Sequence, residues 1–100
     1  MVELFTYGRW TVEEGRETEF VDAWRELAEW SLATIPGAGW ARLLQDRERP
    51  NVFLSFGPWD DLNAVQEWRS HEGFVERIGN MRGLLQDFEA NILDPVAEVG

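Results

Sequence analysis

Residues 52–74 contain the pattern that most restricts the fold: a short apolar run, a Gly-Pro pair and then an amphipathic segment. Residues 52–56 are almost continuously apolar, which predicts a strand that is covered on both faces. Pro58 lacks the N–H that a sheet ladder requires, so we expect strand pairing to stop at this residue. The sequence therefore predicts a buried strand that leads directly into a helix.

Two short helices are predicted after this strand, over residues 60–70 and 71–83. Asp60 is expected to cap the first helix and Ser70 the second, because each side chain can accept a hydrogen bond from a free backbone N–H. Apolar residues recur at helical spacing, which predicts one apolar face on each helix. These residues are Leu62, Val65 and Trp68 on the first helix and Phe74, Ile78 and Met81 on the second.

The rest of the chain predicts three further strands and one longer helix, within a single domain of residues 1–100. The strands are expected at residues 2–12, 39–47 and 84–93, and the helix at residues 17–34. The resulting order is strand, helix, strand, strand, helix pair, strand. This βαββαβ order predicts a ferredoxin-like α+β fold, in which a four-stranded antiparallel sheet carries its helices on one face.

The first strand has apolar side chains at both even and odd positions, including Phe5 and Tyr7. A strand buried on one side only would alternate cleanly, so the face without helices also needs a cover. We expect a homodimer whose sheets meet face to face about a two-fold axis. The alternative cover is the C-terminal tail, residues 94–100, which is too short to cover four strands.

Composition excludes several functions. The net charge of -10 argues against binding to nucleic acid or to an anionic membrane surface. The absence of cysteine and the single histidine, His71, argue against a Ser-His-Asp triad and against a metal site built on histidine or cysteine. No run is long enough to span a bilayer, so we expect a soluble cytoplasmic protein. The six tryptophans indicate an interface or a pocket for a flat ligand.

Two runs of sequence resemble the antibiotic biosynthesis monooxygenase family of dimeric α+β barrels. They are SFGPWDDLNAVQEWRSHEGF, residues 55–74, and EEGRETEFVDAWRELAEWS, residues 13–31. The resemblance implies a dimeric α/β barrel that oxidises a small phenolic, anthrone-like or quinol-like substrate with molecular oxygen. It also implies that no metal, flavin or haem takes part, because an electron-rich, deprotonated substrate can itself reduce oxygen. The protein then only orients the ring, excludes water and stabilises the oxyanion.

Two alternatives to this function are considered. A haem-degrading branch of similar fold uses an Asn, a Trp and a His; the Trp matches Trp68, but the other two positions fall near Gly8 and at Ile78. His71 lies elsewhere, so haem would lack an iron ligand, and we do not favour this activity. The second alternative is a dimer that binds a small ligand without catalysis, because no residue is an evident base.

The resemblance and the helical spacing together give a set of candidate site residues. Trp68 is expected to orient the substrate and to donate its indole N–H to a substrate oxygen, although it could also be a core residue. Tyr7 and Arg82 are candidates for contacting substrate oxygens; Tyr7 could instead lie in the dimer interface and Arg82 in solvent. Asn63 could stabilise an oxyanion or cap its own helix. Phe74, Ile78 and Met81 are expected to form the pocket walls.

Overall fold

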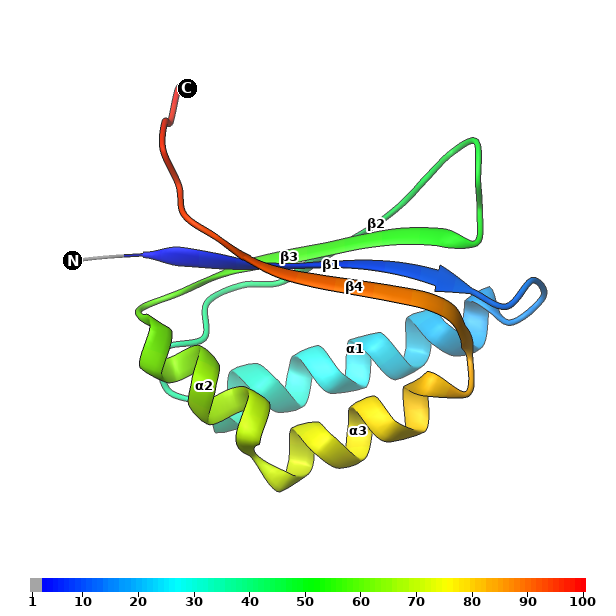
Figure 1. The fold of residues 1–100 in the computed structure, drawn as a ribbon, viewed down its shortest axis with the longest axis horizontal. Coiled ribbons are helices and arrows are strands. Elements are labelled where there is room, and N and C mark those ends of the chain that lie inside the picture. The colour runs from blue at the N-terminus through cyan, green and yellow to red at the C-terminus, as the bar shows by residue number, and fades with distance from the viewer. Residues whose placement is uncertain (1–2) are drawn as a thin grey trace.

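The computed structural model describes residues 3–100, in which a four-stranded antiparallel sheet carries three helices on one face (Figure 1). The strand order is β2-β3-β1-β4, which confirms the predicted ferredoxin-like α+β fold. Val2, predicted to lie in the first strand, falls outside the described residues. The elements are β1 Leu4–Val12, α1 Glu17–Thr34, β2 Arg42–Gln45, β3 Val52–Trp59, α2 Leu62–Ser70, α3 Glu72–Arg82 and β4 Leu85–Leu93.

The core between the sheet and the helices is divided into two clusters, and each is built on one cross-strand pair of β1 and β3. Trp10 pairs with Phe53 in the first cluster, and Leu4 pairs with Trp59 in the second. Packing aromatic rings across two strands stabilises a sheet and buries a large apolar area. The other buried members are Val12, Phe20, Leu27, Ile78, Met81 and Leu84 in the first cluster and Ile35, Ala64 and Val65 in the second.

Only small side chains lie between these two clusters on the helix-facing side of β1 and β3. Thr6 is opposite Gly57, and Gly8 is opposite Ser55. Because side chains alternate along a strand, these four residues share one face of the sheet. Two adjacent rows of small residues cannot fill the space beneath the helices. The sequence thereby creates a gap in the middle of the core, and the cavity described below occupies this gap.

Within residues 3–100, no helix lies over the opposite face of the sheet (Figure 1). Its apolar side chains, which we call the aromatic face, come from all four strands and from the segment before β2. The C-terminal tail does not cover this face, because Val96 and Val99 are 94% and 98% exposed. The alternative in which the C-terminal tail covers this face is therefore wrong. The aromatic face consists of Phe5, Tyr7, Trp40, Leu44, Leu54, Phe56 and Leu93.

Strand β3 continues through Pro58 to Trp59, so the prediction that pairing stops at Pro58 is wrong. Pro58 lies opposite Phe5 on β1, and its carbonyl oxygen accepts a hydrogen bond of 2.9 Å from the N–H of Gly39. The nitrogen and carbonyl of one strand residue point to the same side of the strand. The missing N–H of Pro58 therefore faces the segment before β2, and the proline removes no hydrogen bond to β1.

Strand β2 covers only Arg42–Gln45 and not residues 39–47 as predicted. Immediately before β2, three residues (39–41) lie opposite two residues of β3, which is the pattern of a bulge. The bulge brings the carbonyl oxygen of Trp40 so close to Gly57 that a Cβ at Gly57 would overlap it. The regular ladder can therefore begin only at Arg42.

Helix α2 is capped by Asp61 and not by Asp60 as predicted. The Asp61 carboxylate accepts a hydrogen bond of 2.9 Å from the backbone N–H of Ala64, which satisfies one of the free donors at the helix start. The difference follows from the length of β3. Because the strand extends to Trp59, the chain needs one further residue to turn into the helix.

Helix α3 is capped by His71 and not by Ser70 as predicted. The Nδ1 atom of His71 accepts a hydrogen bond of 2.9 Å from the N–H of Gly73. The Ser70 hydroxyl instead donates to the carbonyl oxygen of Gln66 at 2.9 Å, within α2. Histidine is not among the preferred N-cap residues, which is why the sequence pattern did not point to it.

Gly73 of α3 lies close against Trp30 of α1, and this contact gives a testable prediction about stability. A Cβ at Gly73 would overlap the ring of Trp30. The Arg77 guanidinium carbon lies 4.6 Å from the centroid of this ring, and the centroid of the His71 ring lies 5.0 Å from it. Because these contacts restrain the Trp30 ring, we expect Gly73→Ala to lower the free energy of unfolding by about 1–3 kcal/mol. Urea denaturation of the variant measures this loss.

Gly79 of the same helix provides the control, because within residues 3–100 no atom beyond its own stretch of helix lies within 4 Å of a Cβ built there. Gly79→Ala should raise the free energy of unfolding by about 0.5–1 kcal/mol through helix propensity alone. The close packing of α3 on Trp30 is contradicted if both alanine variants stabilise the protein.

Candidate active site

A cavity of about 290 Å³ lies between the helix-facing side of the sheet and the helices. The small residues of β1 and β3 form its floor. Residues of β4 complete the part of the cavity that the sheet provides. Its volume is close to the lower limit of small-molecule sites, roughly 300 Å³. The side chains that define it are Thr6, Trp10, Ser55, Trp59 and Phe88 from the sheet and Trp24, Leu27, Ser31, Trp68, Phe74 and Ile78 from the helices.

Aromatic rings form two walls of this cavity. Trp68 packs between Trp59 and Phe74, with ring centroids 4.8 Å and 4.5 Å away. On the other side, the Trp10 and Phe88 rings are 4.3 Å apart and tilted by 35°. Tilted and offset rings are favourable contacts between aromatic groups, and they extend naturally to a planar ligand. The cavity is therefore suited to a flat aromatic molecule.

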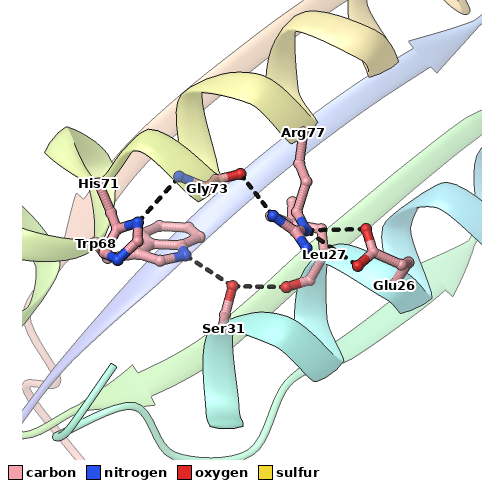
Figure 2. Close-up of polar contacts among 7 residues, drawn as sticks. All are labelled: Glu26, Leu27, Ser31, Trp68, His71, Gly73 and Arg77. Carbon is pink, nitrogen blue, oxygen red and sulfur yellow. Dashed lines mark hydrogen bonds and ion pairs between the residues drawn. The ribbon is translucent and has the colours of Figure 1, made fainter. Parts of the chain in front are cut away.

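The indole N–H of Trp68 is already used within the protein. It donates to the Ser31 hydroxyl at 2.8 Å, and this hydroxyl donates to the carbonyl oxygen of Leu27 at 2.6 Å (Figure 2). An indole has a single donor. In this arrangement Trp68 cannot donate to a substrate oxygen as predicted from the sequence. Its role in the structure is to present its ring to the cavity, held at a fixed angle by α1.

Four of the seven candidate residues place their side chains on this cavity. Phe74 and Ile78 of α3 line it together with Trp68 of α2, and Arg82 lies at its exposed rim in the last turn of α3. Tyr7 also borders the cavity, but the strand pleat directs its phenol to the aromatic face, beside its cross-strand partner Phe56. This position matches the alternative in which Tyr7 is an interface residue.

Met81 and Asn63 do not line the cavity. Met81 is 1% exposed and belongs to the first core cluster, one turn of α3 beyond the cavity wall. Asn63 is exposed in the first turn of α2, where the cap is supplied by Asp61. The helical stripe places Met81 inward correctly, but it cannot distinguish core from cavity wall. Both roles predicted for these residues lack support from their positions.

The residues that the sequence interpretation missed are mainly small polar ones. Thr6, Ser31 and Ser55 each accept a hydrogen bond from a tryptophan and line the cavity. Arg69 of α2 is a second arginine at the rim. The one signal in the sequence that could have pointed to Thr6 and Ser55 is a hydroxyl side chain in the middle of an apolar strand. Their hydrogen-bond partners, Trp59 and Trp10, can be identified only from the fold.

His71 lies outside the cavity, at the junction of α2 and α3. Its Nδ1 is the acceptor of the α3 cap (Figure 2). Its ring also makes an edge-to-face contact with Trp30, with the ring centroids 5.0 Å apart. Among residues 3–100, no group of three or more histidine, cysteine or acidic side chains is arranged as a metal site. Over the same residues, no helix is both long enough and apolar enough to cross a membrane.

The fold and the cavity define a class: ferredoxin-like α+β proteins with an aromatic-walled cavity between the sheet and the helices. The model of the family described as antibiotic biosynthesis monooxygenase matches residues 4–78. The chain belongs to this family. The match includes β1, α1, the β2–β3 hairpin and the helices up to the Ile78 wall of the cavity.

Solved structures show the same fold over almost the whole chain. SnoaB, a cofactor-independent oxygenase from Streptomyces nogalater, is 23% identical and superposes with a TM-score of 0.90, covering 99% of this chain and 98% of SnoaB. A putative antibiotic biosynthesis monooxygenase from Nitrosomonas europaea is 15% identical, with a TM-score of 0.85, covering 98% and 94% of the two chains. No curated protein matches the sequence.

Proposed function

We propose that this protein is a cofactor-independent monooxygenase that oxidises a small phenolic, anthrone-like or quinol-like substrate with molecular oxygen. The observation that carries the proposal is the cavity: an apolar space walled by Trp59, Trp68 and Phe74 on one side and by Trp10 and Phe88 on the other. Family membership and the fold shared with SnoaB support the same reaction class.

The chemistry requires little of the protein beyond binding. For an anthrone-like substrate, the ring CH₂ loses a proton to give an electron-rich enolate, which reduces O₂. One oxygen atom enters the product as a carbonyl and the other leaves as water, so that R₂CH₂ + O₂ gives R₂C=O + H₂O with no external reductant. A dry, aromatic cavity favours this reaction because it orients the ring and excludes water from the reactive intermediate.

The charge at the rim favours an anionic form of the substrate. Arg69 lies in the last turn of α2 and Arg82 in the last turn of α3, and both border the cavity. No ion pair involves either arginine within residues 3–100. In a chain with a net charge of -10, two such cations at one opening attract a phenolate or carboxylate that the rest of the surface repels.

We further propose that the protein acts as a homodimer that buries the aromatic face. This face contains half-buried and exposed apolar side chains on all four strands, and the tail leaves them uncovered. A face-to-face pair of sheets would cover both copies by one isologous contact. Tyr7 and Phe56 lie at its centre, on the two middle strands.

The haem-degrading alternative receives no support from the position of the single histidine. His71 lies off the cavity, and the wall position that this activity would need is occupied by Ile78, which is 9% exposed. The alternative of a non-catalytic binder uses the same cavity and the same dimer. It differs from the enzyme in one measurable property, which is oxygen consumption in the presence of a substrate.

Oxygen uptake separates the enzyme from the binder. We expect chelator-treated, haem-free protein to accelerate the consumption of oxygen by anthrones or dihydroquinones above the rate without protein. Trp68→Phe should lower this rate by about 10-fold or more, because the shorter ring opens the wall and leaves the Ser31 hydroxyl without its indole partner. Tight binding of these compounds with no uptake above the blank would favour the binder.

A further inference from the structure

Three of the tryptophans that line the cavity each donate the indole N–H to a hydroxyl group that also lines it. Because an indole nitrogen can only donate, the hydroxyl oxygen must be the acceptor in every pair. The hydrogen of each hydroxyl is then left for another acceptor. The pairs are Trp68 with Ser31 at 2.8 Å, Trp10 with Ser55 at 2.9 Å and Trp59 with Thr6 at 2.9 Å.

The three hydroxyls differ in what their own hydrogen does. Ser31 donates to the carbonyl oxygen of Leu27, four residues earlier in α1, so its hydrogen-bonding capacity toward a ligand is used. For Thr6 and Ser55, no acceptor is found within residues 3–100. Both side chains are half-buried on the floor of the cavity, where a hydroxyl without an acceptor is partly removed from water. They are therefore two oriented donors facing a ligand site.

Gly8 keeps the space beside these donors open. A Cβ at Gly8 would lie 2.9 Å from the Ser55 Oγ and 3.0 Å from the Trp10 Nε1, which is too close for either atom to remain in place. The glycine thus allows the Trp10–Ser55 hydrogen bond to form and leaves the Ser55 oxygen accessible from the cavity. On the neighbouring row, Gly57 lies opposite Thr6 and likewise carries no side chain.

We propose that Thr6 and Ser55 form a donor pair that recognises two oxygen atoms of one planar aromatic ligand. The inference rests on the proposed function, whose substrate class it narrows to ring systems that bear two carbonyl, quinone or phenolate oxygens. In the sheet register the two residues are diagonal neighbours on β1 and β3, a separation of roughly 7 Å. This spacing favours two oxygens on different parts of the ring system over two hydrogen bonds to one oxygen.

The pair also explains how an apolar cavity can hold an ionised substrate. When the bound ring loses a proton, negative charge develops on its oxygen atoms. Hydroxyl donors that are already aligned by Trp10 and Trp59 stabilise this charge without reorganising. Trp68 and Phe74 contact the face of the ring in this arrangement, and Thr6 and Ser55 fix its rotation within the plane.

The proposal is tested with two probes of the same bicyclic skeleton that the proposed reaction cannot oxidise: 1,4-naphthoquinone, which carries two ring oxygens, and naphthalene, which carries none. Their dissociation constants are measured by quenching of tryptophan fluorescence for the wild-type protein and for Ser55→Ala and Thr6→Val. We expect each variant to weaken quinone binding by about 5-fold and the double variant by about 25-fold, with much smaller changes for naphthalene. Thr6→Ser, which keeps the donor, should restore quinone binding.

Ser31→Ala serves as the matched control, because it breaks an indole–hydroxyl pair without removing a free donor. It should affect the two probes equally. The donor assignment is overturned if Ser55→Ala and Thr6→Val also weaken both probes equally, a result that leaves the proposed function intact. If the wild-type protein binds neither probe, the proposed function fails together with the donor pair. Because neither probe is a substrate of the proposed oxidation, the assay does not depend on turnover.

Discussion

Replacing Ala90 by tryptophan is expected to abolish turnover while leaving the protein folded. Ala90 lies on β4 opposite Gly8 and borders the cavity, but it is exposed and belongs to neither core cluster. A tryptophan side chain at this position extends over Gly8 and occupies the space of the ligand. We expect the rate of oxygen uptake to fall by about 100-fold or more, since small displacements of a bound substrate already have effects of this size.

The same variant should change the free energy of unfolding by only about 0.5 kcal/mol, because the replaced side chain is at the surface. Ala97→Trp is the matched control: it introduces the same ring in the exposed tail, away from the cavity. It should leave both oxygen uptake and stability unchanged. Normal turnover by a folded Ala90→Trp protein would place the reaction outside this cavity.

Replacing Phe56 by glutamate is expected to convert the proposed dimer to a monomer. Phe56 lies at the centre of the aromatic face, paired with Tyr7 and in edge contact with Trp40, whose ring centroid is 5.7 Å away. The two-fold symmetry of the proposed interface introduces two carboxylates into one apolar contact. Removing each carboxylate from water costs several kcal/mol, and Arg42, the cross-strand neighbour of Phe56 on β2, offsets this cost only in part.

Light scattering at micromolar concentration measures this change, and Ala33→Glu is its control. Ala33 is exposed on α1, on the opposite side of the sheet, and the substitution alters the net charge by the same amount. The Ala33→Glu protein should remain dimeric. A wild-type protein that is already monomeric, or a Phe56→Glu protein that stays dimeric, contradicts the proposed use of the aromatic face.

The order of elements and the inward faces of the helices could be predicted because they depend on local spacing. The span of α1 agrees with its apolar stripe from Phe20 to Ser31, and α3 directs Phe74, Ile78 and Met81 to one side. Helical periodicity needs no knowledge of distant residues. The same pattern could not separate Met81 in the core from Ile78 at the cavity, since that difference is set by the sheet beneath.

Boundaries and hydrogen-bond partners could not be predicted, because they depend on contacts between segments. Pro58 is tolerated in β3 only because its nitrogen faces away from β1, and this extension of the strand moves the α2 cap to Asp61. Nothing in the sequence indicates that the Trp68 indole N–H is already used, because its acceptor, the Ser31 hydroxyl, lies 37 residues earlier in the chain. Each correction involves a residue whose partner is distant in the sequence or set by the sheet register.

The most direct test of the cofactor-free monooxygenase is the origin of the oxygen atom in the product. Chelator-treated, haem-free protein is supplied with an anthrone under ¹⁸O₂, and the quinone is analysed by mass spectrometry against a reaction without protein. We expect protein-dependent formation of a quinone that carries one labelled oxygen, and loss of this product with Ala90→Trp. A product whose new oxygen comes from water, or no formation above the blank with any anthrone or dihydroquinone, would contradict the proposed function.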